Sequence, residues 1–317
     1  MTADPPRRIA IIGAGSIGIA WSIVFARAGL TTVLHDADAR RLPAARADIE
    51  NRLTALREAR LLDQSEAAVR KRIRTTADLA DAVRGATHVQ ECAPEDLELK
   101  RAIFRELDSL APPPTTLASS SSALVCSVFA GELPGRGRCL IVHPANPPYL
   151  LPIAEVVPAP FTDPATIASA EDLLRTVGIA PVRVHHEVQG FVFNRLQGAL
   201  LREAYCLVRD GVVSVADVDA LVRDGLGLRW AVIGPFATAE LNTRGGIEAH
   251  AARLGPAYAR MGADRGQHDP WTPELVRRVA EELHRSLPPA DWETNVERRD
   301  QAIMRILVGR GDSPLPS

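Results

Sequence analysis

The segment RIAIIGAGSIG, residues Arg8 to Gly18, determines the predicted fold of this chain. Its first half is a short β-branched run that predicts a buried strand. Its second half has a G-x-G-x-x-G pattern, and the following residues, up to Ala28, have the apolar spacing of a helix. In such a unit the glycines form a tight turn, let a pyrophosphate approach the backbone and allow close helix packing. The segment therefore predicts a nucleotide-binding loop that consists of Gly13, Gly15, Ser16, Ile17 and Gly18.

An acidic residue follows the next predicted strand, Thr31–His35. Asp36 lies eighteen residues after Gly18. A carboxylate at this position accepts hydrogen bonds from the adenosine ribose hydroxyls and repels a 2′-phosphate. The expected cofactor is therefore NAD rather than NADP.

Strands and helices alternate over the first part of the chain, which predicts a mostly parallel sheet with right-handed crossovers. Arginine and alanine dominate a long stretch from Ala39 to Arg74, for which we expect helix. Further strands are expected at 87–92, 115–118, 139–142, 153–157 and 182–184, and a helix at 98–109. After Gly190 the pattern is helical, at 191–208, 215–224, 249–261 and 272–286. The predicted fold is thus α/β, a Rossmann-type doubly wound sheet in residues 1–188, followed by an all-α domain in residues 189–317.

Polar residues follow several predicted strands, where open parallel sheets bind their ligands. They are the glycine loop, Asp36, Glu95, the run Ser119–Ser122 and His143. Glu155 lies within an apolar strand, where a carboxylate is costly unless it is paired. A histidine is the natural partner, because a carboxylate on one ring nitrogen strengthens the other as a base. Asn194, in the first turn of the helical part, is a further candidate to reach the same site.

The composition excludes several classes of protein. The chain has 317 residues, of which 46% are hydrophobic, and a net charge of −2, so it lacks the basic character of a nucleic-acid binder. Ile9–Ala26 is free of charges, as in a signal peptide, but its regular glycines favour the nucleotide loop. The four cysteines are scattered, which is typical of reduced thiols in a cytoplasmic protein. His185-His186-Glu187 lacks the spacing of a zinc helix, and we expect no metal.

These motifs together resemble the 3-hydroxyacyl-CoA dehydrogenase superfamily over nearly the whole chain. They are the glycine loop with Asp36, Glu95 five residues before Lys100, the serine run ending at Ser122, His143 twelve residues before Glu155, and Gly190-Phe191 leading into Asn194-Arg195. The branch of L-gulonate 3-dehydrogenase and lambda-crystallin is similar in two further segments. These are HPANPPY at residues 143–149, and GLRW at 227–230 with Ile233-Gly234-Pro235.

The resemblance implies an NAD-dependent oxidation of the 3-hydroxyl of a small hydroxy acid. It implies that the catalytic residues are Ser122, His143, Glu155 and Asn194, and that Asp36, Glu95 and Lys100 contact the cofactor. Only register favours Ser122 over Ser121. The superfamily also implies a homodimer formed through the helical domain, and we expect no nucleic-acid or membrane partner.

The sequence is compatible with two classes of substrate, a free acid and an acyl-CoA. The branch implies L-gulonate, oxidised to 3-dehydro-L-gulonate, and a free acid needs a cationic anchor, for which Arg229 and Arg244 are candidates. Acyl-CoA enzymes of the superfamily hold the CoA phosphates with lysines after the second strand, where this chain has Arg52, Arg57 and Arg60. Arginine also binds phosphate, so a short-chain 3-hydroxyacyl-CoA or a carnitine-like substrate is the alternative. A non-catalytic NAD-binding structural protein is the alternative from another class.

Overall fold

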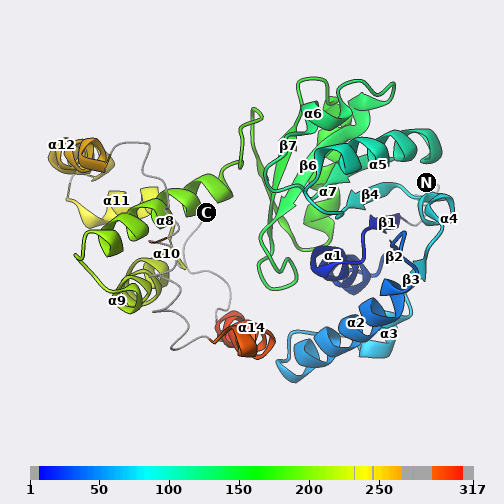
Figure 1. Cartoon of the computed structure of the whole chain (residues 1–317), viewed down its shortest axis with the longest axis horizontal. Coiled ribbons are helices and arrows are strands. Elements are labelled where there is room, and N and C mark those ends of the chain that lie inside the picture. The colour runs from blue at the N-terminus through cyan, green and yellow to red at the C-terminus, as the bar shows by residue number, and fades with distance from the viewer. Residues whose placement is uncertain (1–6, 232, 245, 266–273, 275–287, 310–317) are drawn as a thin grey trace. The chain divides into compact units, whose positions relative to one another are not determined.

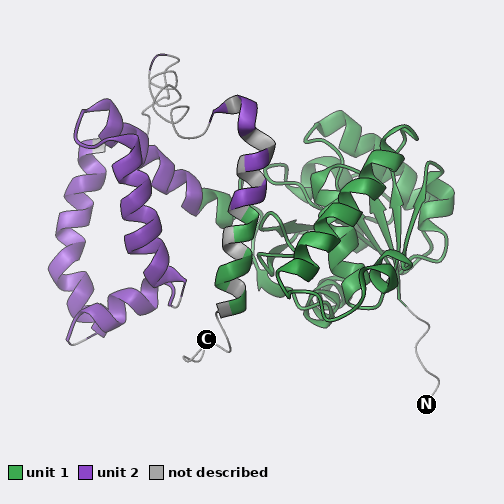
Figure 2. Ribbon diagram, turned by 90° about the horizontal axis from the view of Figure 1, so that it is seen from below, with its two compact units in different colours: residues 1–195, 300–308 green, residues 196–299, 309–317 purple. Residues whose placement is uncertain are grey.

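The computed structural model of the protein describes residues 7–231, 233–244, 246–265, 274 and 288–309. The chain divides into two compact units, coloured separately in Figure 2. Unit 1 comprises residues 1–195 and 300–308, and unit 2 comprises residues 196–299 and 309–317. The boundary expected between residues 188 and 189 stays a prediction.

Unit 1 is built on one eight-stranded sheet with the order β3-β2-β1-β4-β5-β6-β7-β8. All neighbouring strands are parallel except β6 and β7, which are antiparallel. The strands are β1 (Arg8–Ile12), β2 (Thr31–His35), β3 (Ile73–Thr76), β4 (His88–Glu91), β5 (Thr116–Ser119), β6 (Cys139–Pro144), β7 (Ile153–Pro158) and β8 (Ala180–Arg183). The parallel strands β1, β2, β4, β5 and β6 therefore end at the same edge of the sheet.

Helices cover both faces of this sheet, as Figure 1 shows. One core contains β1 residues Ile9 and Ile11 together with α1 (Ser16–Arg27), α2 (Arg41–Glu58), α3 (Glu66–Arg70) and α7 (Pro164–Thr176). The other contains Ala10 and Ile12 together with α4 (Leu79–Val83), α5 (Leu97–Leu110) and α6 (Cys126–Ala130). Successive residues of a strand face opposite sides, so an uninterrupted apolar strand supplies both cores. A short 3₁₀ turn, η1 (Arg136–Arg138), precedes β6. The predicted Rossmann-type sheet is confirmed.

Every regular element of unit 2 in the residues that the structure describes is a helix. Its elements are most of α8 (Phe193–Arg209), α9 (Val215–Ala220), the π-helical η2 (Leu221–Gly227), α10 (Leu228–Trp230), α11 (Pro235–Asn242), α12 (Gly246–Arg265), η3 (Pro289–Asp291) and the first part of α14 (Trp292–Gly309). The last part of α14 belongs to unit 1, where Met304 is buried in the first core. The all-α character predicted for this part is confirmed, while the helix expected at 272–286 lies outside the described residues except for residue 274.

The helical stretch expected from Ala39 to Arg74 is wrong in its last part. The chain forms α2 and the short α3 and then enters β3, which pairs with β2 alone at the edge of the sheet. The strand is only four residues long, IRTT, and none of its residues is fully buried. An edge strand needs little apolar surface, so its sequence carries no alternation that would distinguish it from the polar helices before it.

Candidate active site

The glycine loop has the geometry that a bound diphosphate requires. Gly13 has φ +108°, and a Cβ there would lie 2.8 Å from the Cys92 carbonyl oxygen. A Cβ at Gly18 would collide with the Gly13 carbonyl oxygen, so this glycine allows α1 to pack closely on the loop. Around Gly15, in contrast, no atom lies within 4 Å of an added Cβ. Gly15 begins α1 without a side-chain cap, and no acidic residue occupies the first turn. The free N–H groups and this open approach fit an anionic cofactor.

Asp36 lies where the sequence places it, directly after β2. One carboxylate oxygen accepts a hydrogen bond from Ala14 N–H in the glycine loop at 2.9 Å, and the other accepts one from Asp38 N–H at 2.9 Å. The side chain is thus held against the loop, and it does not cap α2, which begins after Arg40. A carboxylate in this position can accept hydrogen bonds from ribose hydroxyls.

Lys100 and Glu95 lie beside the end of β4. The Lys100 ammonium is 1% exposed and lies 3.0 Å from both carboxylate oxygens of Glu91 and 3.7 Å from Glu95. Both members of the Lys100–Glu91 pair are buried, and Ser119 Oγ and Ala93 N–H also donate to Glu91. Burial raises the pKa of Glu91, and Lys100 opposes this shift. Lys100 therefore holds the end of β4 in place, and a direct contact between Lys100 and the cofactor stays a prediction.

Three of the four hydroxyls in the run Ser119–Ser122 have partners within the protein. Ser119 bonds to Glu91 at 2.5 Å, and Ser120 accepts hydrogen bonds from Gln90 and Trp21. Ser121 donates to Glu95 at 2.5 Å and also lies 2.8 Å from the Leu124 carbonyl. Ser122 is exposed, and its backbone carbonyl accepts a hydrogen bond from Asn194.

Glu95 holds the segment that follows these serines. Its carboxylate accepts hydrogen bonds from Ser121 Oγ and from the backbone N–H groups of Ala123 and Leu124. Burial raises the pKa of Glu95, but these hydrogen bonds and the nearby Lys100 lower it below its ordinary value overall. The carboxylate is thus ionised at neutral pH, and it fixes the backbone on either side of Ser122.

His143 and Glu155 face each other across the β6–β7 ladder. They are paired in the register, and His143 Nδ1 lies 2.8 Å from Glu155 Oε2. Both residues are buried, and the imidazole ring packs against Phe191 and Phe193 at centroid distances of 5.5 and 6.3 Å. The predicted histidine–carboxylate pairing is confirmed as a contact. Glu155 lies on an inner strand, because β8 pairs with β7 on the far side.

The second oxygen of Glu155 binds the start of α8. It accepts hydrogen bonds from Val192 N–H at 2.7 Å and Phe193 N–H at 3.0 Å. Burial raises the pKa of Glu155, but the bonds from His143 and from these two N–H groups outweigh burial and leave the pKa below its ordinary value. Glu155 is therefore ionised at neutral pH. An ionised carboxylate only accepts, so His143 Nδ1 is the donor, and in the neutral form of the ring Nε2 is the nitrogen with the free lone pair.

Asn194 lies beside the serine segment. Its Nδ2 donates to the Ser122 carbonyl oxygen at 2.9 Å. The preceding turn has positive φ at Gly190 and Phe191, +75° and +50°. The turn brings Val192, Phe193 and Asn194 back onto the ends of β5, β6 and β7. Ser122, His143, Glu155 and Asn194 are thus gathered at one edge of unit 1.

Gln90 and Glu91, the two polar residues at the end of β4, are not among the site residues predicted from the sequence. Both are 0% exposed and bond to the serine segment. The sequence did carry a signal for them, because two adjacent polar side chains within a buried strand need hydrogen-bond partners. Arg229 on α10 and Arg244 after α11 are exposed in unit 2, and their role stays a prediction.

Two classes of site are absent from the part of the chain that the structure describes. Within these residues, no group of three or more His, Cys, Asp or Glu side chains is placed to hold a metal ion. No described helix combines the length and apolar character that a membrane span needs.

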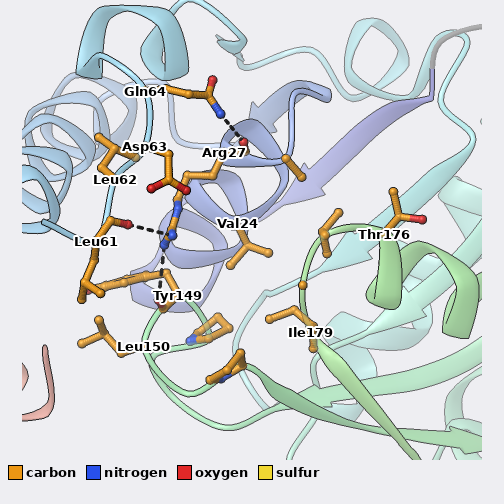
Figure 3. Close-up of a pocket in the computed structure, with 15 residues that line it drawn as sticks. Val24, Arg27, Leu61, Leu62, Asp63, Gln64, Tyr149, Leu150, Thr176 and Ile179 are labelled. Atoms are coloured by element: carbon orange, nitrogen blue, oxygen red, sulfur yellow. Dashed lines mark hydrogen bonds between the residues drawn. The ribbon is translucent and has the colours of Figure 1, made fainter. Parts of the chain in front are cut away.

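A cavity of about 500 Å³ lies elsewhere in unit 1 (Figure 3). Its lining includes Arg27, Asp63, Gln64, Tyr149, Leu150 and Thr176, and none of the site residues above. Arg27 donates to the Leu61 carbonyl at 2.9 Å, and Gln64 donates to the Arg27 carbonyl at 2.7 Å. Arg27 and Gln64 are thus bound to neighbouring groups of the lining, and the cavity does not include the His143–Glu155 pair.

The chain matches known proteins over nearly its whole length. Residues 8–188 match the NAD binding domain of 3-hydroxyacyl-CoA dehydrogenase, and residues 190–284 match its C-terminal domain. A lambda-crystallin homolog of Bos taurus is 40% identical over 312 residues, 96% of each protein. An L-carnitine dehydrogenase of Streptomyces griseus subsp. griseus is 37% identical over 323 residues, 97% of this chain and 91% of that protein.

A solved structure agrees with this assignment. The 5-formyl-3-hydroxy-2-methylpyridine 4-carboxylic acid 5-dehydrogenase, an NAD⁺-dependent dismutase, is 30% identical with a TM-score of 0.80, covering 96% of this chain and 99% of that one. The matching domain binds NAD, and the glycine loop fits that cofactor. The chain therefore belongs to the 3-hydroxyacyl-CoA dehydrogenase family, and it is an NAD-dependent dehydrogenase that acts on a CH–OH group.

Proposed function

We propose that the enzyme oxidises the 3-hydroxyl of a small free hydroxy acid, with L-gulonate converted to 3-dehydro-L-gulonate. The observation that carries this proposal is the 2.8 Å contact between His143 Nδ1 and the ionised Glu155. It leaves His143 Nε2 as a base of fixed tautomer at the edge of the sheet where the glycine loop also lies.

In this proposal His143 Nε2 removes the proton of the substrate hydroxyl. Glu155 keeps the ring in place through Nδ1 and stabilises the imidazolium that forms. Ser122 donates a hydrogen bond to the reacting oxygen, because its hydroxyl is exposed while the three preceding hydroxyls are engaged. Asn194 acts beside it, positioned by its bond to the Ser122 carbonyl. NAD, when bound, accepts the hydride from the substrate carbon.

The cofactor would be held by Gly13, Gly15, Ser16, Ile17 and Gly18, with Asp36 on the adenosine ribose. The uncapped first turn of α1 would receive the diphosphate. Glu95 and Lys100 would complete this side of the site. Lys100 would act through Glu91 and Glu95, since its ammonium is buried between them.

Two of the three arginines named above as possible phosphate ligands, Arg52 and Arg57, favour a free acid over an acyl-CoA. Arg52 forms an ion pair with Asp48 at 2.8 Å, bonds to Ser16 Oγ at 3.2 Å and lies over the Tyr149 ring. Arg57 is paired with Glu66 at 2.9 Å. Cations that already have carboxylate partners are poorly disposed to hold a CoA phosphate. Arg229 and Arg244 remain our candidates to bind the substrate carboxylate.

The test is an NADH-absorbance assay with L-gulonate, 3-hydroxybutyrate, L-carnitine and 3-hydroxybutyryl-CoA. We expect the highest kcat/KM with L-gulonate. A higher value with the CoA thioester or with carnitine would replace our substrate by the alternative. NAD binding without turnover of any of the four would favour a structural role.

We also propose a homodimer formed by unit 2. Several large apolar side chains of this unit are strongly exposed, including Leu221, Leu228, Phe236 and Leu241, each at least 66%. Exposed apolar surface of this kind is typical of an interface. Sedimentation equilibrium would give twice the monomer mass, and a monomer at micromolar concentration would contradict the proposal.

Cys92, Cys126 and Cys139 are free thiols. Unpaired cysteines are typical of proteins from a reducing compartment, which supports our proposal that the enzyme works in the cytoplasm. Fluorescent tagging of the full-length protein in its own cell would test this.

A further inference from the structure

Gln90 is a buried residue that links two strands of the proposed active site. It lies on β4 and is 0% exposed. Its side-chain Nε2 donates to Ser120 Oγ at 2.7 Å and to the Val142 carbonyl oxygen at 3.2 Å. Val142 directly precedes His143, and Ser120 lies two residues before Ser122. One amide group is thus bound to both segments that carry proposed catalytic groups.

The orientation of this amide is determined by its surroundings. A backbone carbonyl only accepts, so the atom facing Val142 O must be the NH₂ group. The carbonyl oxygen of the amide lies 3.1 Å from His88 Nε2. Burial lowers the pKa of His88 to about 4, so the ring is neutral and donates through Nε2. Both N–H bonds of the Gln90 amide, and its oxygen, therefore have partners.

The Ser120 hydroxyl is equally constrained. It accepts from Gln90 and from Trp21 Nε1 at 3.2 Å, which uses both of its lone pairs. Its own proton then points toward Cys92 Sγ, 3.4 Å away. Ser120 is thus fixed by three side chains and has no freedom to act as a catalytic hydroxyl. Its role is to tie the serine segment to β4.

The bridge lies where the sheet itself stops holding these strands together. The β5–β6 ladder ends with Ser119 opposite Ile141, so Ser120 and Val142 come directly after the last pair. Beyond this pair the Gln90 amide bonds to both segments, at Ser120 and at Val142. We propose that Gln90 is a positioning residue, which sets the spacing between the proposed base His143 and the proposed hydrogen-bond donor Ser122. This inference rests on the proposed function.

The test compares Gln90→Met with a matched control, Thr115→Val. Methionine keeps the length of the side chain and removes the amide. Thr115 is 2% exposed and donates to the Ala86 carbonyl at 2.6 Å, before the other end of β5. Each variant loses buried hydrogen bonding beside β5, but only Gln90 touches the proposed catalytic segments.

Five quantities are measured for each protein: Tm, the Kd of NADH by fluorescence, kcat and KM with C3-deuterated and unlabelled substrate, and the NMR titration of the His143 ring. For Gln90→Met we expect kcat to fall about 10- to 100-fold. We also expect a larger deuterium isotope effect, a shifted His143 titration and a Kd of NADH within about twofold of the wild type. Thr115→Val should change Tm alone. Identical behaviour of the two variants in all but Tm would overturn the proposal.

One further variant, and the fact that the His143 titration needs no substrate, keep the test decisive. If Gln90→Met does not fold, Ser120→Ala removes one arm of the bridge and should show the same isotope effect and titration shift in weaker form. Their absence would overturn the proposal. The His143 titration needs no substrate, so it tests Gln90 even if the wild type oxidises none of the four candidates, an outcome that would refute the proposed function instead.

Discussion

The carboxylate of Glu155 binds the His143 imidazole with one oxygen and the first backbone N–H groups of the Val192–Phe193 segment with the other. The strand pairing β6–β7 places the two side chains opposite each other. Glu155 therefore fixes the proposed base and, at the same time, the chain that leads to Asn194. This double attachment makes the pair sensitive to pH and to substitution.

Glu155→Gln should lower the stability of the protein at neutral pH, and this loss should become smaller in acid. The hydrogen bonds to Glu155 outweigh burial and lower its native pKa, whereas the unfolded chain has an ordinary pKa of about 4.3. The stabilisation is therefore fully present above about pH 4.3, and it is lost as the pH falls through the lower native pKa. The Tm difference between wild type and variant should be largest near pH 7 and shrink below pH 4. A difference that stays constant down to pH 3 would contradict this linkage.

The serine run gives a prediction with a built-in control. Ser122→Ala should lower kcat by roughly 10²-fold, since it removes one donor to the reacting oxygen, and it should leave Tm unchanged because Ser122 is exposed. Ser121→Ala removes the partner of Glu95 and Leu124 and should cost about 1–3 kcal/mol of stability. Steady-state kinetics and thermal unfolding separate the two. The reverse pattern would assign catalysis to Ser121.

Two glycines of the cofactor loop should respond in opposite ways to alanine. Gly18→Ala places a methyl group against the Gly13 carbonyl oxygen and should abolish soluble folded protein. Gly15 has an extended backbone and open surroundings, so Gly15→Ala should keep the Tm of the wild type. The added methyl group would occupy the approach of the diphosphate, and NAD should bind about 10-fold more weakly or worse. Calorimetric titration checks this, and unaltered affinity in Gly15→Ala would argue against a diphosphate at this turn.

Asp36→Ala tests the choice of cofactor. Loss of hydrogen bonds to a charged group costs about 1.5–3 kcal/mol, which corresponds to roughly 10- to 150-fold in the Kd of NAD. Discrimination against NADP should decrease as well, since the repulsion of the 2′-phosphate disappears. Asp38→Ala is the matched control, because Asp38 pairs with the exposed Arg40. Equal cofactor constants in both variants would exclude Asp36 from the ribose site.

Local patterns predicted the cofactor loop and the edge of the sheet where the proposed site lies. Gly13 to Gly18 and Asp36 are separated by one helix and one strand, and their spacing follows from the motif itself. The pairing of His143 with Glu155 was also accessible, because a carboxylate within an apolar strand requires a partner.

Contacts between distant segments could not be predicted in this way. Gln90 reaches Ser120 and Val142 only because of the register of β4, β5 and β6, which the sequence does not reveal. The buried Lys100–Glu91 pair depends on how α5 folds back on β4. Our proposal of Ser122 over the other three serines likewise depends on which hydroxyls are already engaged, and it stays a prediction.

The most direct test of the account is His143→Asn, measured together with the Kd of NADH. The substitution removes the base, while asparagine still offers an amide to Glu155. General-base catalysis contributes roughly 10²–10⁴-fold in rate, so we expect turnover of the best substrate to fall by that factor with the Kd of NADH unchanged. Wild-type turnover in this variant would show that His143 does not remove the hydroxyl proton and would contradict the mechanism.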